Sequence, residues 1–204
     1  MTKHIFTYTY PTCEPHLEKA CTSMKKGEVI AYPTDVNWAL GCSPTHKKAI
    51  KKIQQIKKFH PEDKPFSLIC NSISMASDFA YINAASYKIL KKIIPGPYTI
   101  ILPSHKNLEQ LIQDSRKTVG IRIPNNTLVT DLCAKFQSPI LSSSLPCKKE
   151  TLTGYQVVED YGKFIDLILD LKSPLEYKET TIIDMSNDNI KIIRQGLGDI
   201  QALG

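Results

Sequence analysis

The sequence lacks the two glycine-rich loops that most often bind nucleotide phosphates. Neither Gly-x-x-x-x-Gly-Lys-Ser/Thr nor Gly-x-Gly-x-x-Gly occurs in its 204 residues. Any nucleotide would therefore have to be held by side chains and strand ends. A histidine-based hydrolase is also disfavoured, because the five histidines are scattered and none has a plausible nucleophile nearby in the sequence.

Further absences limit the class of protein. No apolar run approaches the roughly 18 residues of a membrane span, and the polar N-terminus is unlike a signal peptide. The six cysteines include no Cys-x-x-Cys pair and no histidine at zinc spacing, which predicts reduced, mostly buried thiols and no zinc site. We expect a cytoplasmic protein whose 204 residues form one domain.

The stretch 29–42 is the most informative part of the chain. A buried strand over 29–32 runs into Pro33, which should end the strand pairing and deliver Thr34 and Asp35 to the end of a sheet. Open α/β sheets bind ligands at such strand ends. The alternative is an ordinary polar turn that closes a hairpin.

Strand and helix patterns interleave along most of the chain. The patterns predict strands over 4–10, 65–70, 98–102, 118–123, 139–141, 164–169, 180–185 and 190–194. They predict helices after a Thr12 cap, after Thr45, over 72–78, 84–94 and 108–113, and after an Asn126 or Thr127 cap. The polar segment 147–154 is expected to be mobile. This order favours an α/β sheet covered on both faces.

Polar or cationic side chains lie at or near the ends of several predicted strands. They are Thr34, Arg122, Ser142, Ser144, Thr180 and Arg194. If these ends converge, they form a pocket suited to an anionic ligand, because arginine pairs bidentately with phosphate or carboxylate. The alternative is that each arginine pairs with a surface carboxylate.

A net charge of +6 permits a polyanionic partner such as ATP or RNA. Six lysines between Lys47 and Lys58 could face RNA, or they could form the solvated face of an amphipathic helix. The solvated face is favoured because no aromatic residues are interleaved there to stack bases.

The sequence resembles the YrdC/YciO family of threonylcarbamoyl-AMP synthases and their relatives over the core region 26–198. The resemblance rests on eight short motifs in order: Ala31-Tyr32-Pro33-Thr34-Asp35 with Ala39-Leu40-Gly41-Cys42; the Lys57 loop; Asp63-Lys64-Pro65; Pro95-Gly96-Pro97-Tyr98-Thr99; Thr118-Val119-Gly120-Ile121-Arg122-Ile123-Pro124; Ser142-Ser143-Ser144; Thr180-Thr181-Ile182-Ile183-Asp184; and Ile193-Arg194-Gln195-Gly196.

This resemblance implies a single-domain α/β fold of the YrdC/RibB type, an open twisted mixed sheet with helices on both faces and a large concave cavity. It also implies a nucleotidyltransferase that condenses ATP, threonine and bicarbonate into threonylcarbamoyl-AMP and pyrophosphate for tRNA modification. By position, threonine would be bound by Thr34, Arg122 and Thr180. ATP, with Mg²⁺ bridging its phosphates, would be bound by Lys57, Thr118, Ser142, Ser144 and Arg194. No residue is assigned a catalytic role, and none a metal.

Three positions depart from the synthase pattern. Phe59 stands where the synthases have an arginine, Pro146 where they have an asparagine, and Ile69 where some have a histidine. The first two departures and the ending Arg194-Gln195-Gly196-Leu197-Gly198-Asp199 are similar to the YciO branch. The resemblance therefore implies an ATP- or AMP-binding protein with weak or altered synthase activity.

Two other classes of function stay open on the sequence. One is a double-stranded RNA or tRNA-binding module without synthase activity, whose footprint would be the lysines from Lys47 to Lys58 with Arg116 and Lys117. The other is a globular protein with a vestigial pocket, which ATP would not stabilise.

Overall fold

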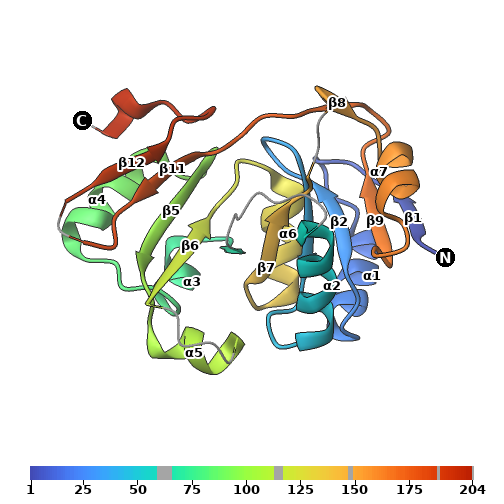
Figure 1. Cartoon of the computed structure of the whole chain (residues 1–204), viewed down its shortest axis with the longest axis horizontal. Helices are drawn as coiled ribbons and strands as arrows, with labels where there is room; N and C mark the ends of the chain where they lie inside the picture. The colour runs from blue at the N-terminus through green and yellow to red at the C-terminus, as the bar shows by residue number, and fades with distance from the viewer. Residues whose placement is uncertain (59–65, 113–116, 147–148, 188, 204) are drawn as a thin grey trace.

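The computed structural model of the chain describes residues 1–58, 66–112, 117–146, 149–187 and 189–203; at 57, 58, 202 and 203 it describes the backbone only (Figure 1). The helices are α1 (Glu14–Lys25), α2 (Lys47–Lys58), α3 (Ile73–Ser77), α4 (Ala84–Ile93), α5 (Lys106–Ile112), α6 (Thr127–Phe136) and α7 (Gly154–Tyr161), with a final 3₁₀ turn η1 (Ile200–Leu203). No helix in these ranges is both long and apolar enough to cross a membrane.

Ten strands form one mixed sheet in the order β1-β9-β2-β3-β7-β4-β6-β5-β11-β12. Their bounds are β1 (Lys3–Phe6), β2 (Ile30–Pro33), β3 (Trp38–Cys42), β4 (Ser67–Ile69), β5 (Tyr98–Pro103), β6 (Thr118–Arg122), β7 (Ile140–Ser144), β9 (Leu167–Asp170), β11 (Thr181–Asp184) and β12 (Lys191–Arg194). A separate two-stranded sheet joins β8 (Thr151–Leu152) to β10 (Leu175–Glu176). The predicted open mixed α/β sheet is confirmed.

Helices cover both faces of the half of the sheet that contains β2, β3 and β7. Apolar residues of α1 and α6 pack with Ile30, Tyr32 and Ile140, whereas residues of α2 and α7 pack with Ala31 and Leu40. Because side chains alternate between faces along a strand, Ile30 and Ala31 enter different layers of the core. Figure 1 shows these elements together, with α4, β11 and β12 at the other end.

The other half of the sheet is more open on one face. Along β5, Tyr98, Ile100 and Leu102 are buried in the same core as residues of α4, while Thr99 and Ile101 on the opposite face are half-buried. This alternation leaves a partly exposed face over β4, β6, β5 and β11. That face positions the candidate site.

Several predicted boundaries are wrong for identifiable reasons. The first strand ends at Phe6, not at residue 10, because its partner β9 ends at Asp170, opposite Phe6. Thr12 does not cap α1; Cys13 occupies the cap position without a side-chain bond, and the Thr12 hydroxyl donates to Asp131 of α6 at 2.7 Å.

The segment around residues 142–161 is more ordered in secondary structure than predicted. Strand β7 continues through Ser144 because Ser142 and Ser143 pair with β3. The segment 147–154, which was expected to be mobile, contains β8. Helix α7 comes next and was not predicted. Thr153 and Gln156 form a capping box that starts α7, a signal present in the sequence as Thr-x-x-Gln. Residues 147 and 148 lie outside the described part.

The thiols of Cys21, Cys42, Cys70 and Cys133 are free and buried as predicted, whereas Cys13 is only half-buried. Burial raises the pKa of Cys42 and of Cys133 to about 12. These thiols are therefore protonated at neutral pH and belong to the core. Cys147 is outside the described residues.

Candidate functional site

A row of small residues crosses the sheet on its open face. Ser142 of β7 lies opposite Gly41 of β3 on one side and Ser67 of β4 on the other, and Ser67 lies opposite Gly120 of β6. Directly paired residues point to the same face of a sheet. These four positions therefore form a shallow floor without large side chains.

The predicted ligand-binding residues of β6 and β7 point to this same face. Thr118 and Arg122 alternate with Gly120 along β6, and Ser144 alternates with Ser142 along β7. Thr118 and Arg122 are nevertheless at opposite ends of β6, about 13 Å apart at 3.3 Å per residue. Arg122 lies at the buried end, whereas Thr118 is exposed at the rim.

Arg122 is the buried cation of the site. Its side chain is 4% exposed, and its Nη2 donates to Asp35 at 2.8 Å. The other carboxylate oxygen of Asp35 accepts the Asn125 backbone N–H at 3.0 Å. Burial lowers the pKa of Arg122 and Asp35 opposes that shift, so the guanidinium remains charged at neutral pH. Its Nε is buried and has no hydrogen-bond partner in the described structure.

The Thr34 hydroxyl is fully engaged within its own turn. It donates to the Asn37 carbonyl at 2.7 Å and lies 3.2 Å from the backbone nitrogens of Val36 and Asn37, which donate to it. The turn also closes the antiparallel β2–β3 hairpin, which was the alternative interpretation of this stretch. Contact between Thr34 and a ligand stays a prediction.

Asn37 is a second buried polar residue of this turn, and no role for it is predicted from the sequence. Its Nδ2 donates to the Lys178 carbonyl at 2.9 Å, which fixes the amide orientation and ties the turn to the segment before β11. Its Oδ1 is buried without a hydrogen-bond partner in the described structure, and the residue is only 4% exposed. Sequence reasoning had no signal for this free acceptor, because the packing of 178 against 36–37 is a long-range contact.

Tyr32 and Ser142 form a buried hydroxyl pair on the same face as the floor, at its β2–β3 end. The Tyr32 hydroxyl donates to Ser142 Oγ at 2.7 Å, and Ser142 Oγ donates to the Leu40 carbonyl at 3.1 Å. Burial raises the pKa of Tyr32, so the phenol remains neutral. Gly41 is required beside it, because a Cβ there would lie 2.6 Å from the Tyr32 ring.

Arg194 and Thr180 are brought together at the far side of the face. Arg194 donates to the Thr180 carbonyl from Nε at 3.1 Å and Nη2 at 3.0 Å, and from Nη1 to Glu179 at 2.8 Å. The Thr180 hydroxyl is 2.9 Å from that of Thr99. The β5–β6 register ends with Ile100 opposite Ile121, one position from Thr99 and Arg122 on their strands.

The remaining predicted positions contribute less to the described site. The side chain of Lys57, together with Phe59, Asp63, Lys64 and Arg116, lies outside the described residues. Ile69 is fully buried in the core with residues of α1 and α6. Pro146 is half-buried, and its carbonyl accepts the Tyr161 hydroxyl at 2.5 Å.

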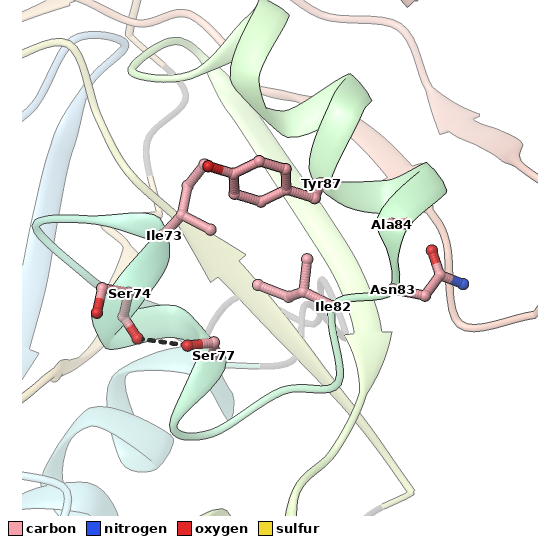
Figure 2. A pocket seen from close by; sticks show the side chains of 7 residues that line it. All are labelled: Ile73, Ser74, Ser77, Ile82, Asn83, Ala84 and Tyr87. Carbon is pink, nitrogen blue, oxygen red and sulfur yellow. Dashed lines mark hydrogen bonds between the residues drawn. The ribbon is translucent and has the colours of Figure 1, made fainter.

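A different pocket, of about 440 Å³, lies between α3 and the start of α4 (Figure 2). Figure 2 shows the Tyr87 ring and the side chains of Ile73 and Ile82 pointing into it, with Ser77 bonded to the Ser74 carbonyl below. None of its lining residues is charged. Arg122 and Arg194 lie on the open sheet face instead, and each is paired with a carboxylate, Asp35 and Glu179 respectively, as the alternative interpretation of the arginines expected.

Comparisons with known proteins agree on one family. The Sua5/YciO/YrdC family model, described as "Telomere recombination", matches residues 22–196. The uncharacterised protein YciO of Escherichia coli K12 is 34% identical over 189 residues, 91% of each chain. The threonylcarbamoyl-AMP synthase of Vibrio vulnificus YJ016 is 30% identical over 89% of this chain and 98% of that one.

Solved structures give the same answer for the fold. The E. coli YciO crystal structure matches with a TM-score of 0.89 and 30% identity over the full length of both chains. P. abyssi Sua5, solved in complex with L-threonine, matches with a TM-score of 0.79 and 23% identity, covering 96% of this chain and 57% of that one.

Proposed function

The chain belongs to the Sua5/YciO/YrdC family, and we propose that it is a nucleotidyltransferase that activates an amino acid, most simply threonine, as a carbamoyl adenylate. The substrates would be ATP with Mg²⁺, the amino acid and bicarbonate. Membership of a family that includes threonylcarbamoyl-AMP synthases supports this class of reaction. A cytoplasmic location and use of the product in tRNA modification are part of the proposal.

The proposed reaction has two steps. The ammonium group of threonine first gives up one proton to bulk water; the free amine nitrogen then bonds to the carbon of bicarbonate, and a carbon–oxygen bond breaks to release water as the carbamate forms. A carbamate oxygen then attacks the α-phosphorus of ATP, and the bond from that phosphorus to the pyrophosphate oxygen breaks. Because no proton must be abstracted in the second step, the protein would act through positioning and charge neutralisation.

The observation that carries the proposal is a buried donor and a buried acceptor without partners, one on Arg122, which pairs with Asp35, and one on Asn37, two residues after Asp35. Arg122 Nε is an unpaired cationic donor, and Asn37 Oδ1 is an unpaired acceptor. Buried polar groups are nearly always paired, so each is expected to bind a ligand or an ordered water. A carboxylate suits Arg122 and an amine suits Asn37. An α-amino acid has both groups on one carbon.

The nucleotide would lie across the small-residue floor. Ser142, Ser144 and Thr118 supply hydroxyls on this face, and Arg194 supplies a second cation. Lys57 would add a third, as the family resemblance implies. The phosphates would hold Mg²⁺, which commonly keeps most of its ligands from phosphate and water. No cluster of three His, Cys, Asp or Glu residues suited to a metal occurs among the described residues.

Pyrophosphate release from ATP tests the function. Release should require both threonine and bicarbonate and should stop when either is omitted. Release that is independent of the amino acid, or absent while a family synthase turns over under the same conditions, would contradict the proposal.

A neighbouring pair of serines offers a matched control for the nucleotide half. Ser144 lies on the proposed face, whereas Ser143 points to the other face of β7. Replacing Ser144 with alanine should raise the KM for ATP by about two- to tenfold, which corresponds to the free energy of one hydrogen bond. Ser143→Ala should leave that KM unchanged. Equal effects of the two variants would remove Ser144 from the site.

A further inference from the structure

We propose that a groove between β1 and the outer face of α1 is a second ligand site, which binds a small organic anion with an apolar body, such as the carboxylate or phosphate monoester of an aliphatic chain. The groove has a volume of about 640 Å³. Strand β1 lies four strands from β7 in the sheet, about 19 Å at 4.8 Å per strand. The groove is therefore separate from the open face that holds Ser142 and Arg122.

The two walls of the groove run in opposite directions. Near the start of α1, His16 Nδ1 lies 3.2 Å from the hydroxyl of Thr7, which follows β1. Beyond the end of α1, the Val29 backbone N–H donates to the Asp166 carboxylate at 2.8 Å, and the Asp166 carbonyl accepts the Lys3 backbone N–H at 2.9 Å. The last turn of α1 therefore lies beside the start of β1.

This arrangement gathers positive charge at one end of the groove. Lys3 at the start of β1 and Lys26 after the last turn of α1 both line it, and Lys19 lines its middle. In the described part of the chain, none of the three ammonium groups has a carboxylate within ion-pair distance. Glu18 is the one acidic lining residue. The excess of positive charge favours an anionic ligand.

A buried hydroxyl at the same end can recognise the anion directionally. Ser23 is 3% exposed and lines the groove, and its hydroxyl makes no hydrogen bond to any described residue. Buried polar groups are nearly always paired, so a ligand or an ordered water is expected to bind there. Thr22 supplies a second, exposed hydroxyl beside it.

The other end of the groove is aliphatic. Ile5 follows Lys3 by two residues and so lies on the same side of β1, and Pro15 lines the groove from the first turn of α1. Leu167 of β9, which pairs with Lys3, is buried in the floor. A ligand with a charged head and an aliphatic body therefore matches both ends.

The size and lining of the groove favour a small molecule of this kind over other anions. Its volume falls within the roughly 300–1,000 Å³ of small-molecule sites, whereas a stable protein partner needs about 800 Å² of surface on each side. No aromatic ring is among the described lining residues, so a nucleobase would have nothing to stack on. Inorganic phosphate would leave Ile5 and Pro15 uncovered.

Displacement of the fluorescent anion 1-anilinonaphthalene-8-sulfonate from the folded chain tests the proposal. Decanoate and decyl phosphate, below the concentrations at which they form micelles, should displace it, and their relative affinities identify the preferred head group. Decyltrimethylammonium and inorganic phosphate should not. Decanoate should also raise the Tm, because a ligand that binds the folded state stabilises it, whereas binding to a partly unfolded chain would lower the Tm.

Single substitutions locate the site. Lys3→Gln and Lys26→Gln each remove one exposed charge and should each weaken decanoate binding about two- to fivefold. Ser23→Ala should weaken it about two- to tenfold, the effect of one lost hydrogen bond.

Lys25→Gln is the matched control. Lys25 lies in the same last turn of α1 and shares its favourable interaction with the helix dipole, but it does not line the groove. This variant should bind decanoate as the parent chain does. Pyrophosphate release should be the same in all four variants, so this proposal and the proposed function fail independently.

Four results would overturn the assignment. They are equal displacement by decyltrimethylammonium, equal losses from Lys25→Gln and Lys26→Gln, a Tm lowered by decanoate, and binding to anionic vesicles in place of free decanoate.

Discussion

At the scale of single residues, the buried guanidinium of Arg122 is expected to affect both the stability of the fold and the binding of the amino acid. Its ion pair with Asp35 has side chains only 4% and 9% exposed. Arg122→Gln leaves the Asp35 carboxylate buried without its cation, and should lower the free energy of unfolding by about 3–5 kcal/mol. Urea denaturation checks this value.

The double variant Asp35→Asn/Arg122→Gln separates the two roles of the arginine. It removes both charges, so much of the stability lost in Arg122→Gln should return, while threonine affinity should not. Recovery of threonine binding together with stability would show that Arg122 acts only on the fold.

Buried thiols should make the protein less stable at alkaline pH. Burial raises the pKa of Cys42 and of Cys133 to about 12, and that of Cys70 well above its usual value. The unfolded chain loses these protons from about pH 8.5, so the free energy of unfolding should fall by about 1.4 kcal/mol per pH unit per thiol above that pH. Urea midpoints measured under reducing conditions between pH 8 and 11 check this.

Cys42→Ala isolates the contribution of one thiol to that slope. The variant should lose less stability than the parent chain as the pH rises. Parallel pH dependences for the two chains would contradict the assignment of the slope to buried thiols.

Residue identities were predicted better than residue contacts. The sequence singles out Thr34, Arg122, Thr180 and Arg194, but it cannot show that the Thr34 hydroxyl is used within its own turn or that Arg194 binds Glu179. Asn37 was left without a role for the same reason. Side-chain hydrogen bonds depend on the folded positions of both partners, and the bond from Asn37 to the Lys178 carbonyl joins residues 141 positions apart, which local patterns do not encode.

At the scale of elements, the close packing of the start of α7 against β9 requires a glycine at position 154. A Cβ on Gly154 would lie 2.2 Å from Asp170 Oδ2, and Asp170 is buried. Gly154→Ala should therefore destabilise the protein by about 2 kcal/mol or more, because the buried carboxylate must move and lose bonds. The shift in the urea midpoint measures it.

Gly120 in the floor is the matched position. A Cβ there would lie 3.4 Å from Thr99 Cγ2, an ordinary contact, so Gly120→Ala should change stability by less than about 1 kcal/mol. Because the methyl group would stand on the proposed nucleotide floor, the variant should weaken ATP binding measured by calorimetry. Unchanged ATP affinity would remove Gly120 from the site.

Hydrophobic periodicity predicted the type of element correctly where the periodic segment was long. The helices α2, α4 and α6 lie within about a residue of their expected starts, and Asn126 caps α6 as proposed. Helix α7 was missed because a polar segment precedes it. Strand β7 extends into the serines because pairing with two neighbours outweighs their weak strand preference.

At the scale of the whole molecule, strand order creates the site and could not be derived from local sequence patterns. Periodicity identifies strands, but it does not say that β7 lies between β3 and β4 or that β6 lies beside β5. The interleaved patterns predicted an α/β sheet, and the resemblance supplied its YrdC/RibB-type architecture. The register then shows which side chains share a face.

Ligand binding should stabilise the whole chain. At 100 times its dissociation constant, a ligand adds about 2.7 kcal/mol, which for about 200 residues is a rise in Tm of roughly 5–11 °C. ATP and threonine should each raise the Tm, and the double variant Asp35→Asn/Arg122→Gln should keep the rise with ATP but lose that with threonine. No rise with either ligand would identify a vestigial pocket.

Isotope labelling shows directly whether the open face joins an amino acid, bicarbonate and ATP into one adenylate. The chain is incubated with ATP, Mg²⁺, threonine and ¹³C-bicarbonate, and nucleotide products are analysed by mass spectrometry. We expect an AMP adduct that contains threonine and one labelled carbon and is absent without threonine. AMP or ADP as the only nucleotide products, with no label incorporated, would contradict it.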